Sequence, residues 1–207
     1  MKIEHFNQLG DADNFLSTYI NNISKNNKNF LISGGTSFLE VLKQLSLKQN
    51  FFNFHLSDDR DVKSGSPDSN LFSYNCLKYN NINFKGFVPQ EDFKKTIDDY
   101  EKKLPKNYFD LSLLGVGDDG HVASIFPNKC NFFYKSTNSF YCESDHHKYN
   151  RFSLNLDYIL KSKNIILYFR GDNKIKAYNN FFNKNFYPLN RLIDQKKKLM
   201  IITAGKE

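Results

Sequence analysis

The chain has 207 residues, of which 40% are hydrophobic and 25% charged, and its formal net charge is +7. This length and composition are typical of a globular protein, so we expect a single domain over residues 1–207 with one well-buried core. No stretch approaches the roughly 20 apolar residues of a membrane helix, and Met1–Asn14 has neither a signal-peptide nor a transit-peptide pattern. We therefore expect no membrane partner and a cytoplasmic location.

The positive charge does not by itself choose between two classes of partner. Basic proteins bind nucleic acids by neutralising phosphates, but a positive protein attracts small phosphorylated anions just as well. The lysines are spread through Asn-rich segments, and the only tight run, Lys196–Lys198, precedes an apolar strand candidate. Because there is no recognised motif or aromatic-basic stripe, we expect no nucleic-acid partner.

The cysteines are Cys76, Cys130 and Cys142. Their odd number and wide spacing argue against both a disulfide framework and a zinc cluster. We therefore expect reduced thiols.

Short apolar runs bounded by turn residues alternate along the chain with longer segments of helical period, which is typical of βαβ units. In chain order we expect helix 12–24, strand 29–33, helix 37–47, strand 51–56, helix 70–79, helix 91–103, strand 109–114, short strands 139–143 and 149–154, strand 164–169, helix 173–183 and strand 199–203. This pattern predicts an α/β fold: a doubly wound, mostly parallel sheet flanked by helices on both faces, in a Rossmann-like domain.

Functional side chains in such sheets gather at the carboxyl ends of strands, and four polar clusters stand at such ends here. The first is the turn Ser33, Gly34, Gly35 and Thr36, between an apolar strand and a helix. Glycine lets the backbone approach a ligand, and the N–H groups of a helix N-terminus bind anions. The alternative is a tight connection in which Thr36 is only an N-cap.

The second cluster is Asp58, Asp59 and Arg60, followed by residues 66–70 with Asn70 at the start of the next helix. An arginine held between carboxylates would donate a pair of hydrogen bonds to an anionic or polyhydroxyl ligand. The alternative is a surface ion-pair loop with a helix cap.

The third cluster follows an apolar strand and places three glycines, among them Gly117 and Gly120, directly before His121. Histidine is the side chain whose ordinary pKa lies closest to neutral pH, and a carboxylate at Asp119 would orient it. This arrangement suits a general base that activates water.

A metal site is the competing interpretation of the third cluster. No second histidine stands at ligand spacing, and the pair His146–His147 lies in a polar segment that we interpret as solvated. We expect His5 and His55 to be structural or surface residues, and we expect no metal.

The fourth cluster is distributed: Arg151 precedes an apolar alternation, and Lys174 follows a strand and opens a helix. Arginine offers a fork of N–H donors to phosphate, and lysine a point charge beside helix-terminal N–H groups. Each alone is also compatible with an ordinary surface charge.

The four clusters, in this order, resemble the 6-phosphogluconolactonase family, in the larger superfamily that includes glucosamine-6-phosphate deaminase. Residues 115–127 are similar to its signature Gly-x-Gly-x-Asp-Gly-His-x-Ala-Ser-Leu-Phe-Pro, with Ile125 in place of Leu. Residues 58–62 and 67–70 resemble its Asp-Glu-Arg-x-Val and Pro-x-Ser-Asn elements, and residues 33–36 its Ser-Gly-Gly-Ser/Thr turn. Arg151 matches its Arg-Ile-Thr-Leu strand and Lys174 its Gly-x-x-Lys helix start.

The resemblance implies hydrolysis of 6-phosphogluconolactone, with His121 deprotonating the attacking water and Asp119 orienting it. Arg60, steadied by Asp58 or Asp59, would help to stabilise the oxyanion. The expected substrate- and phosphate-binding residues are Ser33, Gly34, Gly35, Thr36, Asp58, Asp59, Asn70, Gly117, Gly120, Arg151 and Lys174. We expect Ser124 to be structural, no cofactor, a sugar-phosphate lactone as the partner, and a monomer or weak homo-oligomer.

Two other functions remain open. A glucosamine-6-phosphate deaminase or isomerase needs a further carboxylate shortly after the histidine, and residues 122–127 contain none. A non-catalytic sugar-phosphate sensor would keep the phosphate-binding residues but would not need His121 and Asp119.

Overall fold

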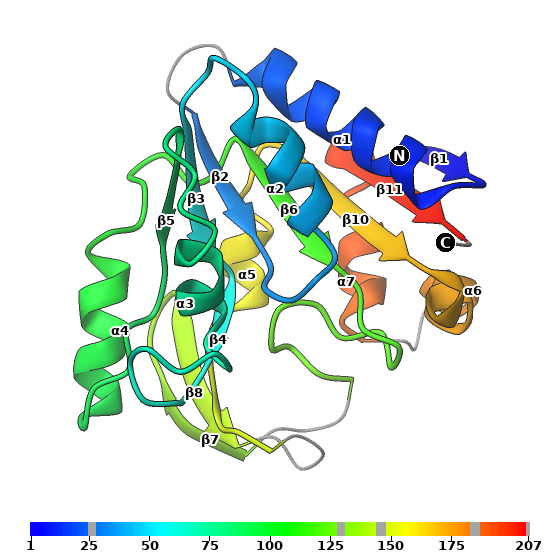
Figure 1. The fold of residues 1–207 in the computed structure, drawn as a ribbon. Helices are drawn as coiled ribbons and strands as arrows, with labels where there is room; N and C mark the ends of the chain where they lie inside the picture. Colours follow the sequence, from blue (N-terminus) through cyan, green and yellow to red (C-terminus); the bar gives the residue numbers. More distant parts are fainter. Residues whose placement is uncertain (25–27, 128–130, 144–147, 183–186, 206–207) are drawn as a thin grey trace.

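The computed structural model describes residues 1–24, 28–127, 131–143, 148–182 and 187–205. Its centre is a sheet of seven strands in which every neighbouring pair is parallel (Figure 1). The strand order is β1 (Lys2–Phe6), β11 (Leu199–Ala204), β10 (Ile165–Arg170), β6 (Leu111–Gly115), β2 (Asn29–Ile32), β3 (Phe52–Leu56) and β5 (Ile82–Lys85). After β2 the chain adds β3 and β5 toward one edge of the sheet. After β6 it adds β10 and β11 toward the other edge, so the strand order reverses between β2 and β6.

Helices cover both faces of this sheet because its strands are apolar on both sides. In β2, Phe30 and Ile32 pack into one hydrophobic cluster and Leu31 into the other. The first cluster includes α1 (Leu9–Ile23), α2 (Leu39–Ser46) and α3 (Asn70–Asn75). The second includes α4 (Phe93–Glu101), α5 (Leu156–Ile159), α6 (Ile175–Phe181) and α7 (Leu189–Ile193). Two 3-10 turns, η1 (Asp172–Lys174) and η2 (Lys196–Lys198), precede α6 and β11.

A second sheet of four antiparallel strands lies beyond the carboxyl end of β3 (Figure 1). Its order is β4 (Asp58–Arg60), β9 (Arg151–Leu154), β8 (Ser139–Glu143) and β7 (Asn131–Lys135). Only Ser57 separates β3 from β4, and the N–H of Leu154 donates to its carbonyl at 2.8 Å. The small sheet is therefore joined directly to the large one.

The predicted α/β class, parallel sheet and helical layers are confirmed, and all five long strands lie within a residue or two of their expected bounds. The structure adds β1, β4, β5, β7, α5 and α7, which the sequence pattern did not predict. Helix α3 ends at Asn75 and not at Tyr79, because the chain turns through Lys78, whose φ is 51°. The expected end of the helix at Asn183, the pair His146–His147 and Cys130 lie outside the described residues.

Within the described residues, no helix is both long and apolar enough to cross a membrane.

Candidate active site

A cavity of about 560 Å³ opens where the strand order reverses, beside the carboxyl ends of β2 and β6. Ligands of open α/β sheets bind in this crevice. Most of the predicted site residues line it: Ser33, Gly34, Gly35, Asp58, Arg60, Asn70, Gly117, Asp119, His121, Arg151 and Lys174. Thus the fold brings together the four clusters that the sequence separates.

The imidazole of His121 is held by Asp119. After β6 the chain makes a tight turn in which the N–H of Gly120 donates to the carbonyl of Gly117 at 2.9 Å, with a φ of 86° at Gly120. Asp119 Oδ1 then lies 2.6 Å from His121 Nδ1 and accepts the His121 backbone N–H at 3.1 Å. This carboxylate therefore fixes the orientation of the ring.

The same contacts stabilise the charged form of Asp119. Its partial burial opposes ionisation, but the hydrogen bonds and the attraction of His121 outweigh that effect and lower the pKa of Asp119 to about 2. Asp119 is thus an anion throughout the neutral range, as an orienting partner of an imidazole must be.

Gly117 leaves the space in which this ring lies. A Cβ atom at position 117 would lie 2.2 Å from both Cε1 and Nδ1 of His121. On another side the ring of Phe126 packs against the imidazole, with the ring centroids 5.1 Å apart. The glycine before the turn is therefore a requirement of the histidine position and not only of the turn.

Two arginines of the small sheet face each other at the cavity. In the β4–β9 pair Arg60 stands directly opposite Arg151. Arg151 is only 9% exposed, its Nη1 has no hydrogen-bond partner, and burial lowers its pKa. Like charges directly opposite in a sheet are unfavourable, and an unpaired buried donor costs free energy, so this pair is suited to an anionic ligand.

The predicted steadying of Arg60 by Asp59 acts on its backbone, because Asp59 Oδ1 accepts the Arg60 N–H at 2.8 Å and does not contact the guanidinium. The guanidinium of Arg60 donates instead to the carbonyl of Asp68 at 2.6 Å and to Oδ1 of Asn70 at 3.4 Å. Asp58 accepts from Ser124 Oγ at 2.7 Å, in agreement with a structural Ser124.

Asp59 does not line the cavity and is fully buried behind its wall. Its carboxylate accepts the backbone N–H groups of Arg60, Asn70 and Leu71 and the hydroxyl of Ser69, at 2.7 to 3.0 Å. Burial raises the pKa of Asp59 despite these bonds. The residue therefore joins β4 to the start of α3 and positions Asn70.

The turn after β2 is shaped by Asn70 as well. A Cβ atom at Gly34 would lie 2.0 Å from Asn70 Cγ, and Gly35 has a φ of 85°, so neither position suits a larger residue. Thr36 is not an N-cap, because α2 begins at Leu39 with Phe38 before it. Its side chain lines a neighbouring hollow instead of the main cavity, and Gly120 lines neither.

The sequence profile of the family described as glucosamine-6-phosphate isomerases/6-phosphogluconolactonase matches residues 11–201. The chain belongs to this family. It is 30% identical over 220 residues to the 6-phosphogluconolactonase of Borreliella burgdorferi, covering 94% of this chain and 91% of that protein. It is 34% identical over 106 residues to the 6-phosphogluconolactonase of Thermotoga maritima, covering 46% of this chain and 48% of that protein.

Solved structures share the fold. The 6-phosphogluconolactonase of Shewanella baltica superposes with a TM-score of 0.85 at 19% identity, over 100% of this chain and 98% of that one. A monomeric glucosamine-6-phosphate deaminase gives 0.79 at 17% identity, over 99% and 97%. Fold similarity alone therefore does not separate the two activities within the family.

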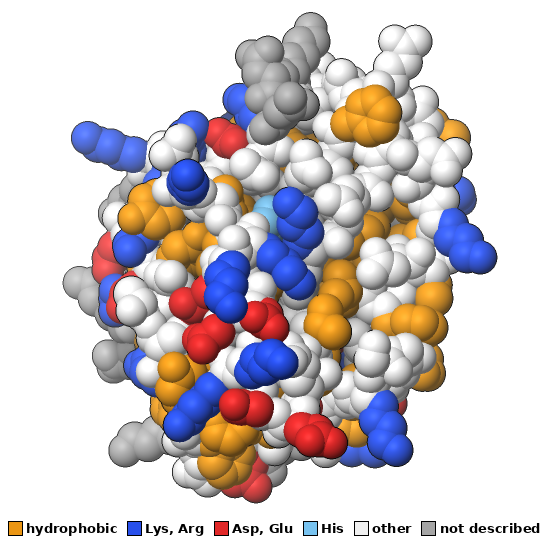
Figure 2. All heavy atoms as spheres, turned by 90° about the vertical axis from the view of Figure 1, so that its left-hand side faces the viewer, with side chains coloured by type: hydrophobic (Ala, Val, Ile, Leu, Met, Phe, Trp, Pro, Cys, Tyr) orange, Lys and Arg blue, Asp and Glu red, His pale blue; other side chains and the backbone are white. Residues whose placement is uncertain are grey.

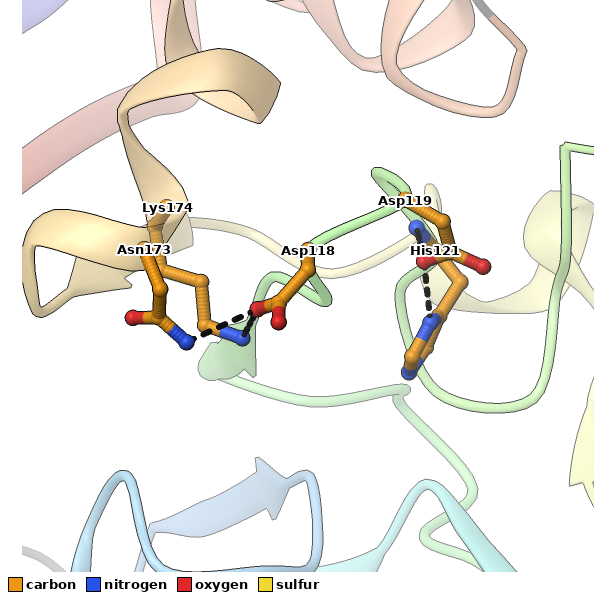
Figure 3. Close-up of polar contacts among 5 residues, drawn as sticks. All are labelled: Asp118, Asp119, His121, Asn173 and Lys174. Atoms are coloured by element: carbon orange, nitrogen blue, oxygen red, sulfur yellow. Dashed lines mark hydrogen bonds and ion pairs between the residues drawn. The ribbon is translucent and has the colours of Figure 1, made fainter.

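The family signature leaves two cavity residues, Val116 and Asp118, unspecified. Asp118 occupies a variable position of the signature, yet its carboxylate accepts hydrogen bonds from Lys174 Nζ and from Asn173 Nδ2 at 3.0 Å (Figure 3). Ser37 and Phe126 line the cavity too and were not predicted. Only the fold, which places β6 beside β10, brings Asp118 to Lys174.

The cavity is lined by carboxylates and cations together. Figure 2 shows one face of the molecule, on which lysine and arginine side chains stand among aspartate and glutamate side chains. Among the described residues, no group of three or more His, Cys, Asp or Glu side chains is arranged to hold a metal ion.

Proposed function

We propose that this chain hydrolyses 6-phospho-D-glucono-1,5-lactone to 6-phospho-D-gluconate, the reaction of the oxidative pentose phosphate pathway. The observation that carries the proposal is the His121–Asp119 pair, 2.6 Å apart, in a cavity that also holds Arg60, Arg151 and Lys174. Relatives named 6-phosphogluconolactonase support it, including one that aligns with 94% of the chain.

In the proposed reaction His121 takes a proton from a water molecule as the water oxygen attacks the lactone carbonyl carbon. The tetrahedral oxyanion then collapses, the bond from that carbon to the ring oxygen breaks, and His121 returns the proton to the leaving oxygen. A positioned general base contributes about 10²- to 10⁴-fold. Ser124 is not needed as a nucleophile, since its hydroxyl donates to Asp58.

Different cations of the cavity would bind different parts of the substrate. Arg151 and Lys174 would hold the 6-phosphate, together with backbone N–H groups of Gly34 and Gly35, and the unpaired Nη1 of Arg151 supports this role. Arg60 would face the carbonyl oxygen and stabilise the oxyanion, held in place by Asn70.

The deaminase alternative has less support. Its chemistry requires a further carboxylate next to the histidine, and the segment from Val122 to Pro127 has none. Asp118, the nearest other carboxylate in the turn, bonds Lys174 instead.

The experiment is hydrolysis of freshly generated 6-phosphogluconolactone by the purified chain, corrected for spontaneous opening and run with and without EDTA. The lactone without its phosphate and glucosamine 6-phosphate are the comparison substrates. We expect EDTA-resistant hydrolysis that is faster for the phosphorylated lactone. A rate equal to the spontaneous one would refute the lactonase; ammonia release from glucosamine 6-phosphate would then favour the deaminase, and its absence the sensor.

A further inference from the structure

Consecutive aspartates of one turn engage different partners. Asp119 bonds His121, whereas Asp118 points the other way and bonds Lys174 and Asn173 (Figure 3). The side chain of Lys174 is only 18% exposed, and that of Asp118 is 64% exposed. The ammonium thus lies in the cavity wall, while its carboxylate partner is open to solvent.

A phosphate group that binds in the cavity would contact the Lys174 ammonium, which donates to Asp118 when no ligand is bound. Lysine has three N–H donors and no acceptor, and Asp118 accepts from one of them, so the carboxylate and a phosphate draw on the same small set of donors. A phosphate carries close to two negative charges at neutral pH, and a carboxylate next to it repels it. Asp118 therefore stabilises Lys174 before a ligand binds and opposes the ligand when it arrives.

The exposure of Asp118 makes such an exchange feasible. An ion pair whose carboxylate is open to solvent contributes little free energy, so a phosphate that is also held by Arg151 can displace the carboxylate. The pair between Asp13 and Arg170 shows the contrast: Asp13 is fully buried, lies 3.0 Å from Arg170 Nη2 and also accepts the hydroxyl of Tyr168. That pair is a permanent part of the core, and the pair of Asp118 is not.

We propose that Asp118 is a displaceable counter-ion of Lys174, which positions the ammonium at the cavity, yields it to the phosphate group and thereby sets the affinity for that group. The inference rests on the proposed function in one respect: it takes Lys174 as a phosphate ligand. Asp118 is a positioning residue, since it acts through Lys174.

The test is calorimetric binding of inorganic phosphate, and separately of 6-phosphogluconate, to the purified chain and its variants. We expect Asp118→Asn to bind both about two- to fivefold more tightly, because the phosphate no longer has to displace a carboxylate from Lys174. Asp118→Glu keeps the carboxylate and should bind like the unaltered chain. In a Lys174→Ala background the change at Asp118 should have no effect.

Asp157→Asn is the matched control, since it removes the same charge from an exposed arginine pair, Asp157 with Arg191, outside the cavity. Equal or weaker phosphate binding by Asp118→Asn, or the same gain without Lys174, would overturn the proposal, and so would a lack of phosphate binding by every variant. Lactone hydrolysis is measured separately. If the effect of Asp118→Asn on phosphate binding depends on Lys174 but the chain does not hydrolyse the lactone, the proposed function is refuted and the counter-ion proposal stands.

Discussion

The two sheets supply the site in different ways. The parallel sheet contributes residues that follow its strands: His121 and Asp119 after β6, Lys174 after β10, and the glycine turn after β2. The antiparallel sheet contributes Arg60 and Arg151 from within paired strands, where they stand opposite each other. A parallel sheet thus collects side chains at one edge, whereas an antiparallel pair fixes them by register.

This difference suggests a division of labour, in which the turn after β6 performs the chemistry and Arg151 on β9 binds the phosphate of the substrate. Variants on the two sides should then change different kinetic constants. A loss of kcat with little change in KM is expected on the first side, and a rise in KM on the second.

Among the variants that test this comparison, the largest effect is expected from Gly117→Ala. Its Cβ would overlap the His121 ring at 2.2 Å, so the imidazole must leave its position beside Asp119. Because a displacement of about 1 Å can cost 10²-fold, we expect kcat for the lactone to fall about 100-fold. Gly10→Ala is the matched control, since nothing lies within 4 Å of the added atom. Unchanged kcat in Gly117→Ala would show that the ring position does not matter.

Arg151→Ala tests the other side. Loss of a charged hydrogen bond to phosphate is worth about 1.5 to 3 kcal/mol, so we expect KM to rise about 10- to 100-fold with a smaller change in kcat. The control is Arg191→Ala, which removes an arginine that pairs with Asp157 outside the cavity. If KM stays constant while kcat falls, Arg151 acts in the chemistry and the division between the sheets fails.

The smallest effect concerns the core of the parallel sheet. His55 on β3 is buried, and burial together with the Lys85 charge lowers its pKa to about 4. At pH values between the ordinary histidine pKa of about 6.5 and the lowered pKa of His55, this side chain is protonated in the unfolded chain but not in the folded one. The free energy of unfolding therefore falls as the pH falls through this window. From pH 7.5 to 5.5 the contribution is about 1 kcal/mol.

Urea unfolding at pH 7.5 and pH 5.5 measures this change in the free energy of unfolding. His55→Leu should lose about 1 kcal/mol of the pH dependence of unfolding, and His5→Gln should keep it. Equal pH dependence in His55→Leu and the unaltered chain would mean that His55 titrates normally in the folded state.

The sequence predicts the parallel sheet better than the antiparallel one, for physical reasons. Strands buried on both faces, such as β10, are continuous apolar runs that stand out from the helices between them. The strand β4 reads Asp-Asp-Arg, which has no strand propensity, and it exists only because β9 pairs with it. The edge strand β1 has no buried residue, so its pattern gives little signal.

The site shows the same limit. His121, Asp119 and the glycines follow from one local segment, so the sequence could place them together. The contact of Asp118 with Lys174 joins residues 56 positions apart, and the burial of Asp59 depends on the start of α3. Such contacts follow from tertiary structure, which is why Asp118 was missed and Asp59 was placed in the cavity.

The most direct test of the central claim is the rate of 6-phosphogluconolactone hydrolysis by His121→Ala, with the unaltered chain and His5→Ala measured in parallel. His5 lies on β1 and bonds Thr203 outside the cavity. We predict that kcat falls at least about 100-fold in His121→Ala and stays unchanged in His5→Ala. A kcat for His121→Ala within about twofold of the unaltered chain would contradict general-base catalysis by this histidine.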